Sequence, residues 1–121
     1  LMTAAHYKLD QLTLFVDRNG LQIDGPTAQV MNIEPLEKKL AAFGWFVQTI
    51  DGHDVAAIDQ AIKRAKAASG KPSAIILNTV KGKGVSFMEN IVGWHGTPPD
   101  LKQSEQARKE LEARLHKEEQ A

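Results

Sequence analysis

The chain has 121 residues, a length that suits one modest domain, and its 15 basic residues balance its 15 acidic ones. This balance gives no electrostatic case for nucleic acid or an anionic membrane as a partner. The absence of cysteine excludes disulfides and cysteine-based zinc sites. No apolar run approaches the ~20 residues of a membrane-spanning helix, and the first residues do not read as a signal peptide, so we expect a cytoplasmic protein.

The first part of the chain shows a helical pattern, an apolar run and a second helical pattern. Residues 1–9 have apolar residues at helical spacing, and LTLFV at residues 12–16 is typical of a strand covered on both faces. We expect a loop over residues 17–32. A helix should then open at Glu34-Pro35 and stop at Gly44.

The middle of the chain repeats this alternation. The run WFVQTI at residues 45–50 predicts a strand, and Asp54 is placed to cap a helix over residues 55–68. A third buried strand is predicted for AIILNTV at residues 74–80. The apolar stripe of the helix is predicted to consist of Val55, Ile58, Ile62 and Ala65.

The last part of the chain has no strand pattern. Residues 85–100 form a segment too long for a simple connection, which indicates a functional loop. Residues 101–121 predict a charged helix with a thin apolar stripe, and we divide the chain into a domain at residues 1–100 and this C-terminal helix.

Strands that alternate with helices predict the α/β class, with right-handed crossovers and a parallel sheet that has helices on both faces. The three strands run into DRNG, DGHD and KGKG, which are rich in glycine and polar residues. In a parallel sheet these loops share the carboxyl edge, where open α/β sheets bind ligands. The sequence therefore predicts a ligand site at this edge.

Oxygen ligands for a divalent ion follow the first strand. Asp17, Asn19 and Asp24 are hard donors of the kind that Mg²⁺ prefers. The side chain of Asn19 and a backbone carbonyl two residues later could supply adjacent ligands. The alternative is that Asn19-Gly20 is only a turn, since Asn tolerates the left-handed conformation.

Two other loops carry candidate chemistry. KGKG, residues 81–84, could bind phosphate through backbone N–H groups and lysine charge, or could be a solvated turn. His95, in GWHGTPP, could exchange protons near neutral pH or be a surface histidine. For His53 in DGHD we favour a structural role; His6 and His116 are predicted to be structural and solvated.

Taken together, AAHYKLDQLTLFVDRNGLQIDG, FGWFVQTIDGHD, KPSAIILNTVKGKGVSFMEN and WHGTPP closely resemble transketolase. The resemblance is to the thiamine diphosphate-binding N-terminal subunit of the split bacterial type, and it covers the C-terminal portion of that subunit. It implies a partial thiamine diphosphate-binding fold. It also implies a part in moving a two-carbon ketol unit from a ketose phosphate to an aldose phosphate, the chemistry of the pentose phosphate pathway.

The resemblance also implies roles for individual residues and for two cofactors, thiamine diphosphate and Mg²⁺, with Ca²⁺ or Mn²⁺ as substitutes for the metal. Asn19 and Leu21 would hold the metal through a side-chain and a backbone oxygen, and Ile23 would pack near the cofactor's thiazolium. Lys81 would lie near cofactor phosphate and substrate, and His95 would contact substrate and assist proton transfer.

The Gly-Asp-Gly start of the family's cofactor motif is missing, and the DG pairs at Asp24 and Asp51 come after Asn19. The resemblance therefore implies partners: an upstream fragment with this half-motif and a pyrimidine-binding subunit. We expect association, sugar phosphates as substrates, and no activity of the chain alone. The alternatives are a truncated, noncatalytic interaction module and part of a related enzyme such as deoxyxylulose-phosphate synthase.

Overall fold

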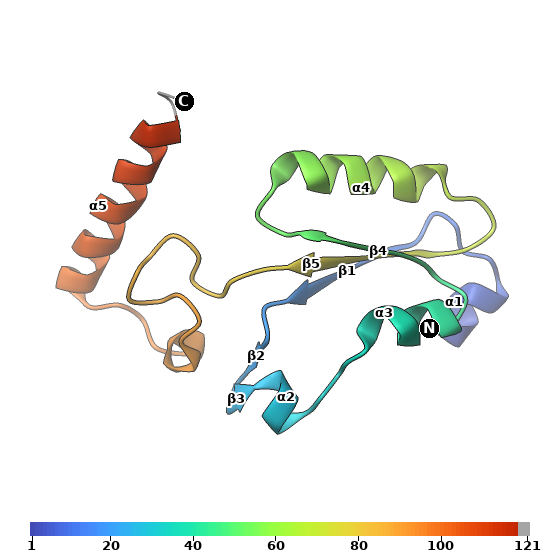
Figure 1. Cartoon of the computed structure of the whole chain (residues 1–121), viewed down its shortest axis with the longest axis horizontal. Coiled ribbons are helices and arrows are strands. Elements are labelled where there is room, and N and C mark those ends of the chain that lie inside the picture. The colour runs from blue at the N-terminus through green and yellow to red at the C-terminus, as the bar shows by residue number, and fades with distance from the viewer. Residues whose placement is uncertain (119–121) are drawn as a thin grey trace.

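The computed structural model describes residues 1–118, and its centre is a parallel sheet of three strands in the order β1-β5-β4. The strands are β1 (Thr13–Arg18), β4 (Phe46–Asp51) and β5 (Ser73–Asn78). The three predicted strands are thus confirmed in place, each with its bounds shifted by one or two residues. The prediction that the first strand is covered on both faces is wrong, because β1 is an edge strand in which no residue is buried and Phe15 is 45% exposed. The last strand in sequence is the middle strand in space (Figure 1).

Helices cover both faces of the sheet, as the α/β pattern predicts. Helix α4 (Val55–Ala67) lies on one face, and α1 (Met2–His6) and α3 (Leu36–Ala42) lie on the other (Figure 1). Successive residues of β5 point to opposite faces of the sheet, because side chains alternate along a strand. On the α4 face the buried residues are Ala61, Ala65 and Ile75. On the α1 and α3 face they are Ala4, Leu40, Trp45, Ala74 and Ile76.

Helix α4 begins where the sequence predicts. The Asp54 side chain accepts a hydrogen bond from the backbone N–H of Ala57 at 3.0 Å, which confirms the cap. The predicted stripe is wrong at Val55, whose exposed fraction is 79%. Val55 is the first residue of α4, and the small side chains of Ala61 and Ala65, farther along the helix, pack on the sheet instead.

The two helices on the opposite face are shorter than their patterns suggest. α1 ends at His6, soon before Lys8 adopts a left-handed φ of 52°. Pro35 is the N-cap residue of α3 rather than part of its first turn. Gly44 follows that helix with a φ of 86°, as a glycine stop should.

The predicted loop over residues 17–32 is wrong in one respect, because it contains regular structure. β2 (Leu21–Gln22) and β3 (Gly25–Pro26) pair as a small antiparallel hairpin, and α2 (Thr27–Val30) follows it. The hairpin turns at Ile23-Asp24 and not at Asn19-Gly20. Such short pairings leave no run of alternating residues for a pattern to detect.

The predicted irregular segment after β5 is confirmed, with one 3₁₀ turn, η1 (Val92–His95). Helix α5 (Leu101–Glu118) then stands to one side of the sheet (Figure 1). It confirms the predicted C-terminal helix for residues 101–118, and residues 119–121 lie outside the described part of the chain. No helix within residues 1–118 has the length and apolar character needed to cross a membrane. The division of domains at residue 100 stays a prediction.

Candidate functional site

A pocket of about 250 Å³ is formed by three segments that follow β1 and β5. The turn after β1 and the β2–β3 hairpin form one wall, and the KGKG loop and η1 form the others. Its lining residues are Asn19, Leu21, Gln22, Ile23, Lys81, Val92 and His95. The structure thus brings together all five residues that the resemblance singles out, although they come from segments up to 76 positions apart (95 minus 19).

The Asn19-Gly20 pair forms a turn of defined geometry. The Asn19 Oδ1 atom accepts a hydrogen bond from the backbone N–H of Leu21 at 2.9 Å, and Gly20 has a φ of 73°. The pair therefore does turn the chain, but the left-handed residue is Gly20 and not Asn19 as expected from the sequence. The turn does not exclude a ligand role, because an amide oxygen has two lone pairs and this bond uses one.

The carbonyl of Leu21 lies on the same side of β2 as the Asn19 amide oxygen. Leu21 is paired with Pro26, which has no N–H, and the flanking pair is the bonded one, since the Thr27 N–H donates to Gly20 at 2.9 Å. Bonded and non-bonded pairs alternate along an antiparallel ladder, so Leu21 turns both backbone polar groups away from β3. Its N–H meets Asn19, and its carbonyl points to that same side.

The two other oxygen donors of the sequence do not line the pocket. Asp17 accepts a hydrogen bond from the hydroxyl of Thr79, which joins the ends of β1 and β5. Asp24 is exposed in the hairpin turn. Among residues 1–118, no group of three or more His, Asp or Glu side chains is arranged to hold a metal ion.

Two of the four N–H groups of the KGKG loop, those of Lys83 and Gly84, and that of the next residue, Val85, already have hydrogen-bond acceptors within the chain. The N–H groups of Lys83 and Val85 donate to carbonyls of the same loop at 3.2 Å, and that of Gly84 donates to the Glu89 carboxylate at 2.9 Å. This leaves those three groups unavailable for the phosphate contact that the motif suggests. The half-buried Lys81 is the part of the loop that reaches the pocket.

His95 is the last residue of η1 and is exposed at the pocket. The turn that carries it is anchored by the preceding residue. The indole N–H of Trp94 donates to the Phe87 carbonyl at 2.9 Å, and the two aromatic rings meet edge to face at 5.5 Å. This anchor fixes the orientation of the 3₁₀ turn from which the His95 side chain projects.

His53 has the structural role that we favour from the sequence. Its Nε2 atom accepts a hydrogen bond from the backbone N–H of Val80 at 2.8 Å, one residue before Lys81. The preceding Gly52 allows this approach, because a Cβ there would lie 2.4 Å from the Thr79 methyl group. The DGHD motif therefore fixes the position of the chain just after the end of β5.

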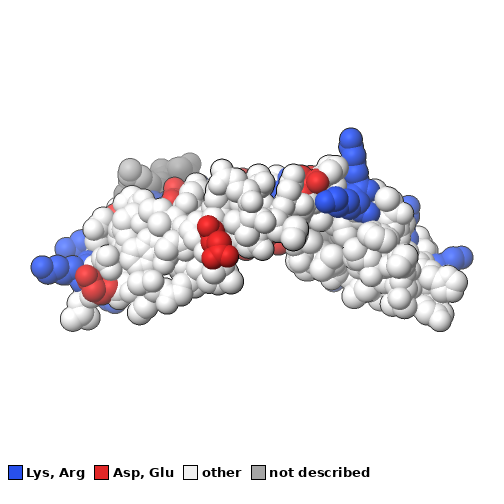
Figure 2. Space-filling view, turned by 90° about the horizontal axis from the view of Figure 1, so that it is seen from below, with Lys and Arg blue, Asp and Glu red and all other residues white. Residues whose placement is uncertain are grey.

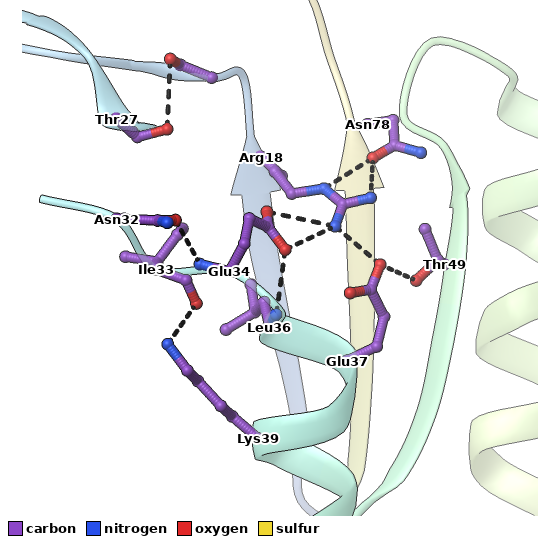
Figure 3. Close-up of polar contacts among 11 residues, drawn as sticks. Arg18, Thr27, Asn32, Ile33, Glu34, Leu36, Glu37, Lys39, Thr49 and Asn78 are labelled. Atoms are coloured by element: carbon purple, nitrogen blue, oxygen red, sulfur yellow. Dashed lines mark hydrogen bonds and ion pairs between the residues drawn. The ribbon is translucent and has the colours of Figure 1, made fainter. Parts of the chain in front are cut away.

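The structure contains an ionic network beside the pocket that we do not predict from the sequence. The Arg18 guanidinium contacts Asn78, Glu37 and Glu34, which come from the end of β5 and the start of α3 (Figure 3). The backbone N–H of Glu37 and then this guanidinium hold the pKa of the Glu37 carboxyl below its ordinary value. Local patterns cannot reveal contacts between residues 60 positions apart.

A second carboxylate fastens α5 to the loop after β5. Glu110 accepts hydrogen bonds from the backbone N–H and the hydroxyl of Ser86, at 2.6 and 2.8 Å. The Ser86 N–H, the Gln106 amide and the Ser86 hydroxyl together lower the pKa of the Glu110 carboxyl.

Comparison with known families gives one match over nearly the whole chain. Residues 1–118 match the family described as "Transketolase, thiamine diphosphate binding domain".

Two curated relatives have names of the same kind. The chain is 48% identical over 117 residues to the 6-deoxy-6-sulfo-D-fructose transketolase subunit SqwG of a Clostridium species. It is 40% identical over 116 residues to one of the subunits of the apulose-4-phosphate transketolase of Phocaeicola vulgatus. These alignments cover 97% and 96% of the chain but only 41% of each relative, so the chain spans about two fifths of their length.

A solved structure has the same fold. The crystal structure of transketolase from Campylobacter jejuni superimposes with a TM-score of 0.84 at 32% identity. The match covers 91% of this chain and 17% of that one.

Proposed function

Since the chain belongs to the transketolase family of thiamine diphosphate-binding domains, we propose that it forms part of a transketolase active site. The assembly moves a two-carbon ketol unit from a ketose phosphate to an aldose phosphate. The observation that carries this proposal is the pocket that gathers Asn19, Leu21, Ile23, Lys81 and His95. The transketolase names of the relatives favour this enzyme over deoxyxylulose-phosphate synthase.

Asn19 and Leu21 are the proposed metal ligands for Mg²⁺, or for Ca²⁺ or Mn²⁺ in its place. Their side-chain and backbone oxygens lie on one side of β2, and both are hard donors that suit such an ion. Two ligands are too few for an ion that takes about six oxygens. Phosphate, water and further polypeptide, including the aspartate of a Gly-Asp-Gly segment, supply the rest.

The other pocket residues suit the cofactor and the sugar. Thiamine diphosphate, when bound, supplies the electron sink for the two-carbon fragment. Ile23, with 65% of its surface exposed, offers apolar contact to an aromatic ring, and the Lys81 ammonium offers charge to phosphate. His95 holds or delivers a proton at the substrate oxygens, a role that an imidazole performs near neutral pH.

We propose that a pyrimidine-binding subunit covers this side of the molecule. Ile23, Met31 and Ile91 are exposed by 65%, 64% and 45%, which is costly for large apolar side chains in water. Charged side chains are sparse on the face seen in Figure 2, the side on which β3 and α2 lie in Figure 1. Apolar residues at the rim of a site are suited to contact with another protein.

Cofactor binding by the chain with its partners tests the function. Quenching of tryptophan fluorescence by thiamine diphosphate is measured with and without Mg²⁺ for the chain alone and for the assembly with both proposed partners, in the Trp45→Phe background so that Trp94 is the tryptophan of this chain that is observed. We expect tight, Mg²⁺-dependent binding and ketol transfer only in the assembly. Asn19→Ala should weaken binding at least tenfold, whereas Gln22→Ala, at a neighbouring pocket residue without an assigned role, should not.

Two outcomes would contradict the proposal. Tight binding by the isolated chain would show that no partner completes the site. Failure of the full assembly to bind cofactor would favour the noncatalytic interaction module, and equal binding by the wild type and Asn19→Ala would contradict the role of Asn19 as a metal ligand.

A further inference from the structure

Arg18 ends β1, and its side chain joins elements that are far apart in the sequence (Figure 3). Its Nε and Nη2 atoms donate to Asn78 Oδ1 at 2.9 and 2.7 Å, across to the end of β5. Its Nη1 atom donates to Glu37 Oε1 in α3 at 2.7 Å, and it lies 3.4 Å from Glu34 Oε1. We call these four side chains, of Arg18, Glu34, Glu37 and Asn78, the Arg18 clamp.

The two carboxylates of the Arg18 clamp are themselves held in place. Glu34 Oε2 accepts the backbone N–H of Leu36 at 3.0 Å, at the start of α3. Glu37 Oε1 accepts the hydroxyl of Thr49 at 3.2 Å, from β4. The guanidinium therefore connects all three strands of the sheet and one helix (Figure 3).

The Arg18 clamp is partly shielded from water. The Arg18 side chain is 21% exposed, and those of Glu37 and Glu34 are 39% and 45% exposed. A planar guanidinium that uses several of its fixed donors at once restricts its own orientation more than a lysine ammonium does. The clamp therefore fixes a geometry, whatever its net contribution to stability.

The position of the Arg18 clamp coincides with the end of the strand pairing. Arg18 and Asn78 are the last register pair of β1 and β5, and the next backbone bond, from the Thr79 N–H to the Arg18 carbonyl, is already 3.4 Å long. The turn that presents Asn19 begins at once. Between Arg18 and the β2–β3 ladder, which begins at Gly20 and Leu21, the direction of the chain depends on side-chain contacts.

We propose that Arg18 is a positioning residue for the metal ligands. By fixing the exit of β1, it keeps the Asn19 amide oxygen bonded to the Leu21 N–H and aims the Leu21 carbonyl to the same side. The identity of the ion rests on the proposed function. The geometry that Arg18 maintains does not, and it can be measured separately.

The chain offers a matched arginine that separates positioning from stability. Arg64, in α4, donates its Nε to Gln48 Oε1 of β4 at 2.6 Å. This bond also joins two elements through a guanidinium, but it belongs to the face of the sheet that packs on α4. Substitution of Arg64 removes a comparable bond without touching the exit of β1.

The test uses the full chain, with Mn²⁺ alone as a paramagnetic probe in nuclear magnetic resonance. The Mn²⁺ concentration that half-broadens the Leu21 amide signal is compared among variants, with urea unfolding as the stability reference. Arg18→Met should raise that concentration about tenfold, as expected for loss of a residue that orients a ligand. Arg64→Met should leave it within about twofold. Asn78→Leu should act like Arg18→Met, whereas Asn78→Asp, which keeps the acceptor, should act like the wild type.

Equal effects of Arg18→Met and Arg64→Met, or equal damage from the two Asn78 variants, would overturn the inference. If Mn²⁺ does not broaden Leu21 selectively in the wild type, the metal assignment fails, and the exchange rate of the Leu21 amide decides the inference instead. Faster exchange in Arg18→Met than in Arg64→Met at matched stability supports positioning. Equal exchange rates overturn it.

Discussion

The sheet and the pocket segments are built in opposite ways. In β5, Ala74, Ile75 and Ile76 are each 0% exposed, between helices on both faces. In residues 19–33, whose first part lines the pocket, Gly25 is the one buried residue, and Ile23 and Met31 are largely exposed. The sheet is held by apolar burial, whereas the pocket segments are held by hydrogen bonds and by glycines in left-handed conformations. Substitutions should therefore separate stability from binding.

The largest expected effect comes from the middle of the sheet. Ile76→Ala removes a fully buried side chain from the core and should lower the free energy of unfolding by about 3 kcal/mol. Ile23→Ala, at the pocket, should change it by less than about 0.5 kcal/mol, because most of that side chain is in water. Urea unfolding followed by circular dichroism measures both. Similar losses would mean that the pocket segment shares the core.

Two glycines of the pocket segments should differ from each other. Gly82 has a φ of 72°, and a Cβ there would lie 2.6 Å from the Met88 carbonyl oxygen, so Gly82→Ala should cost about 2 kcal/mol or more. Gly20 has nearly the same φ, 73°, but open space around it, so Gly20→Ala should cost only about 1 kcal/mol. Urea unfolding of the two variants measures the difference. Equal costs would show that the KGKG loop relaxes freely.

Acid should release α5 from the loop before the sheet unfolds. The pKa of Glu110 in the folded chain is below the ordinary 4.5, so its ionised form contributes stability that is present above about pH 4.5. That contribution is lost as the pH falls through the lowered pKa. The amide signal of Ser86, followed by nuclear magnetic resonance against pH, should report this step. The step should be absent in Glu110→Gln, and its persistence there would assign it to another group.

The smallest expected effect comes from a surface ion pair. Lys63 and Asp59 meet at 2.6 Å one turn apart on α4, with side chains 65% and 55% exposed. Asp59→Asn should change the free energy of unfolding by about 0.3 kcal/mol, and added salt should abolish the difference. A loss as large as that of Gly20→Ala would mean that the outer face of α4 is less solvated than its exposure indicates.

The sequence predicts the sheet well because each strand is a continuous apolar run and Asp54 marks the start of α4 by its chemistry. It fails where the structure depends on distant partners. The β2–β3 hairpin contains only two residue pairs, and Val55, the first residue of α4, is exposed although the apolar pattern includes it. No local pattern indicates that Arg18 forms a hydrogen bond with Asn78, 60 positions away.

The candidate site also has features that the sequence can indicate and features that depend on distant partners. One pocket is lined by Asn19, Leu21, Ile23, Lys81 and His95, a set that motif likeness could indicate and periodicity could not. The chemistry assigned to them stays a prediction. Asp17 and the N–H group of Gly84 have suitable atoms but are bonded to Thr79 and Glu89, because the sequence records which groups exist and not which bonds they already make. Asp24 is exposed in the hairpin turn, outside the pocket lining.

The central place of β5 has a consequence for the order of folding. Within residues 1–118, β1 and β4 do not pair with each other, and each pairs only with β5, which follows both in the chain. During synthesis neither strand has a partner in this sheet until residue 78 has left the ribosome. Pairing over such sequence distances is slow. Until then, the apolar strands β1 and β4 depend on local helices or chaperones for protection from aggregation.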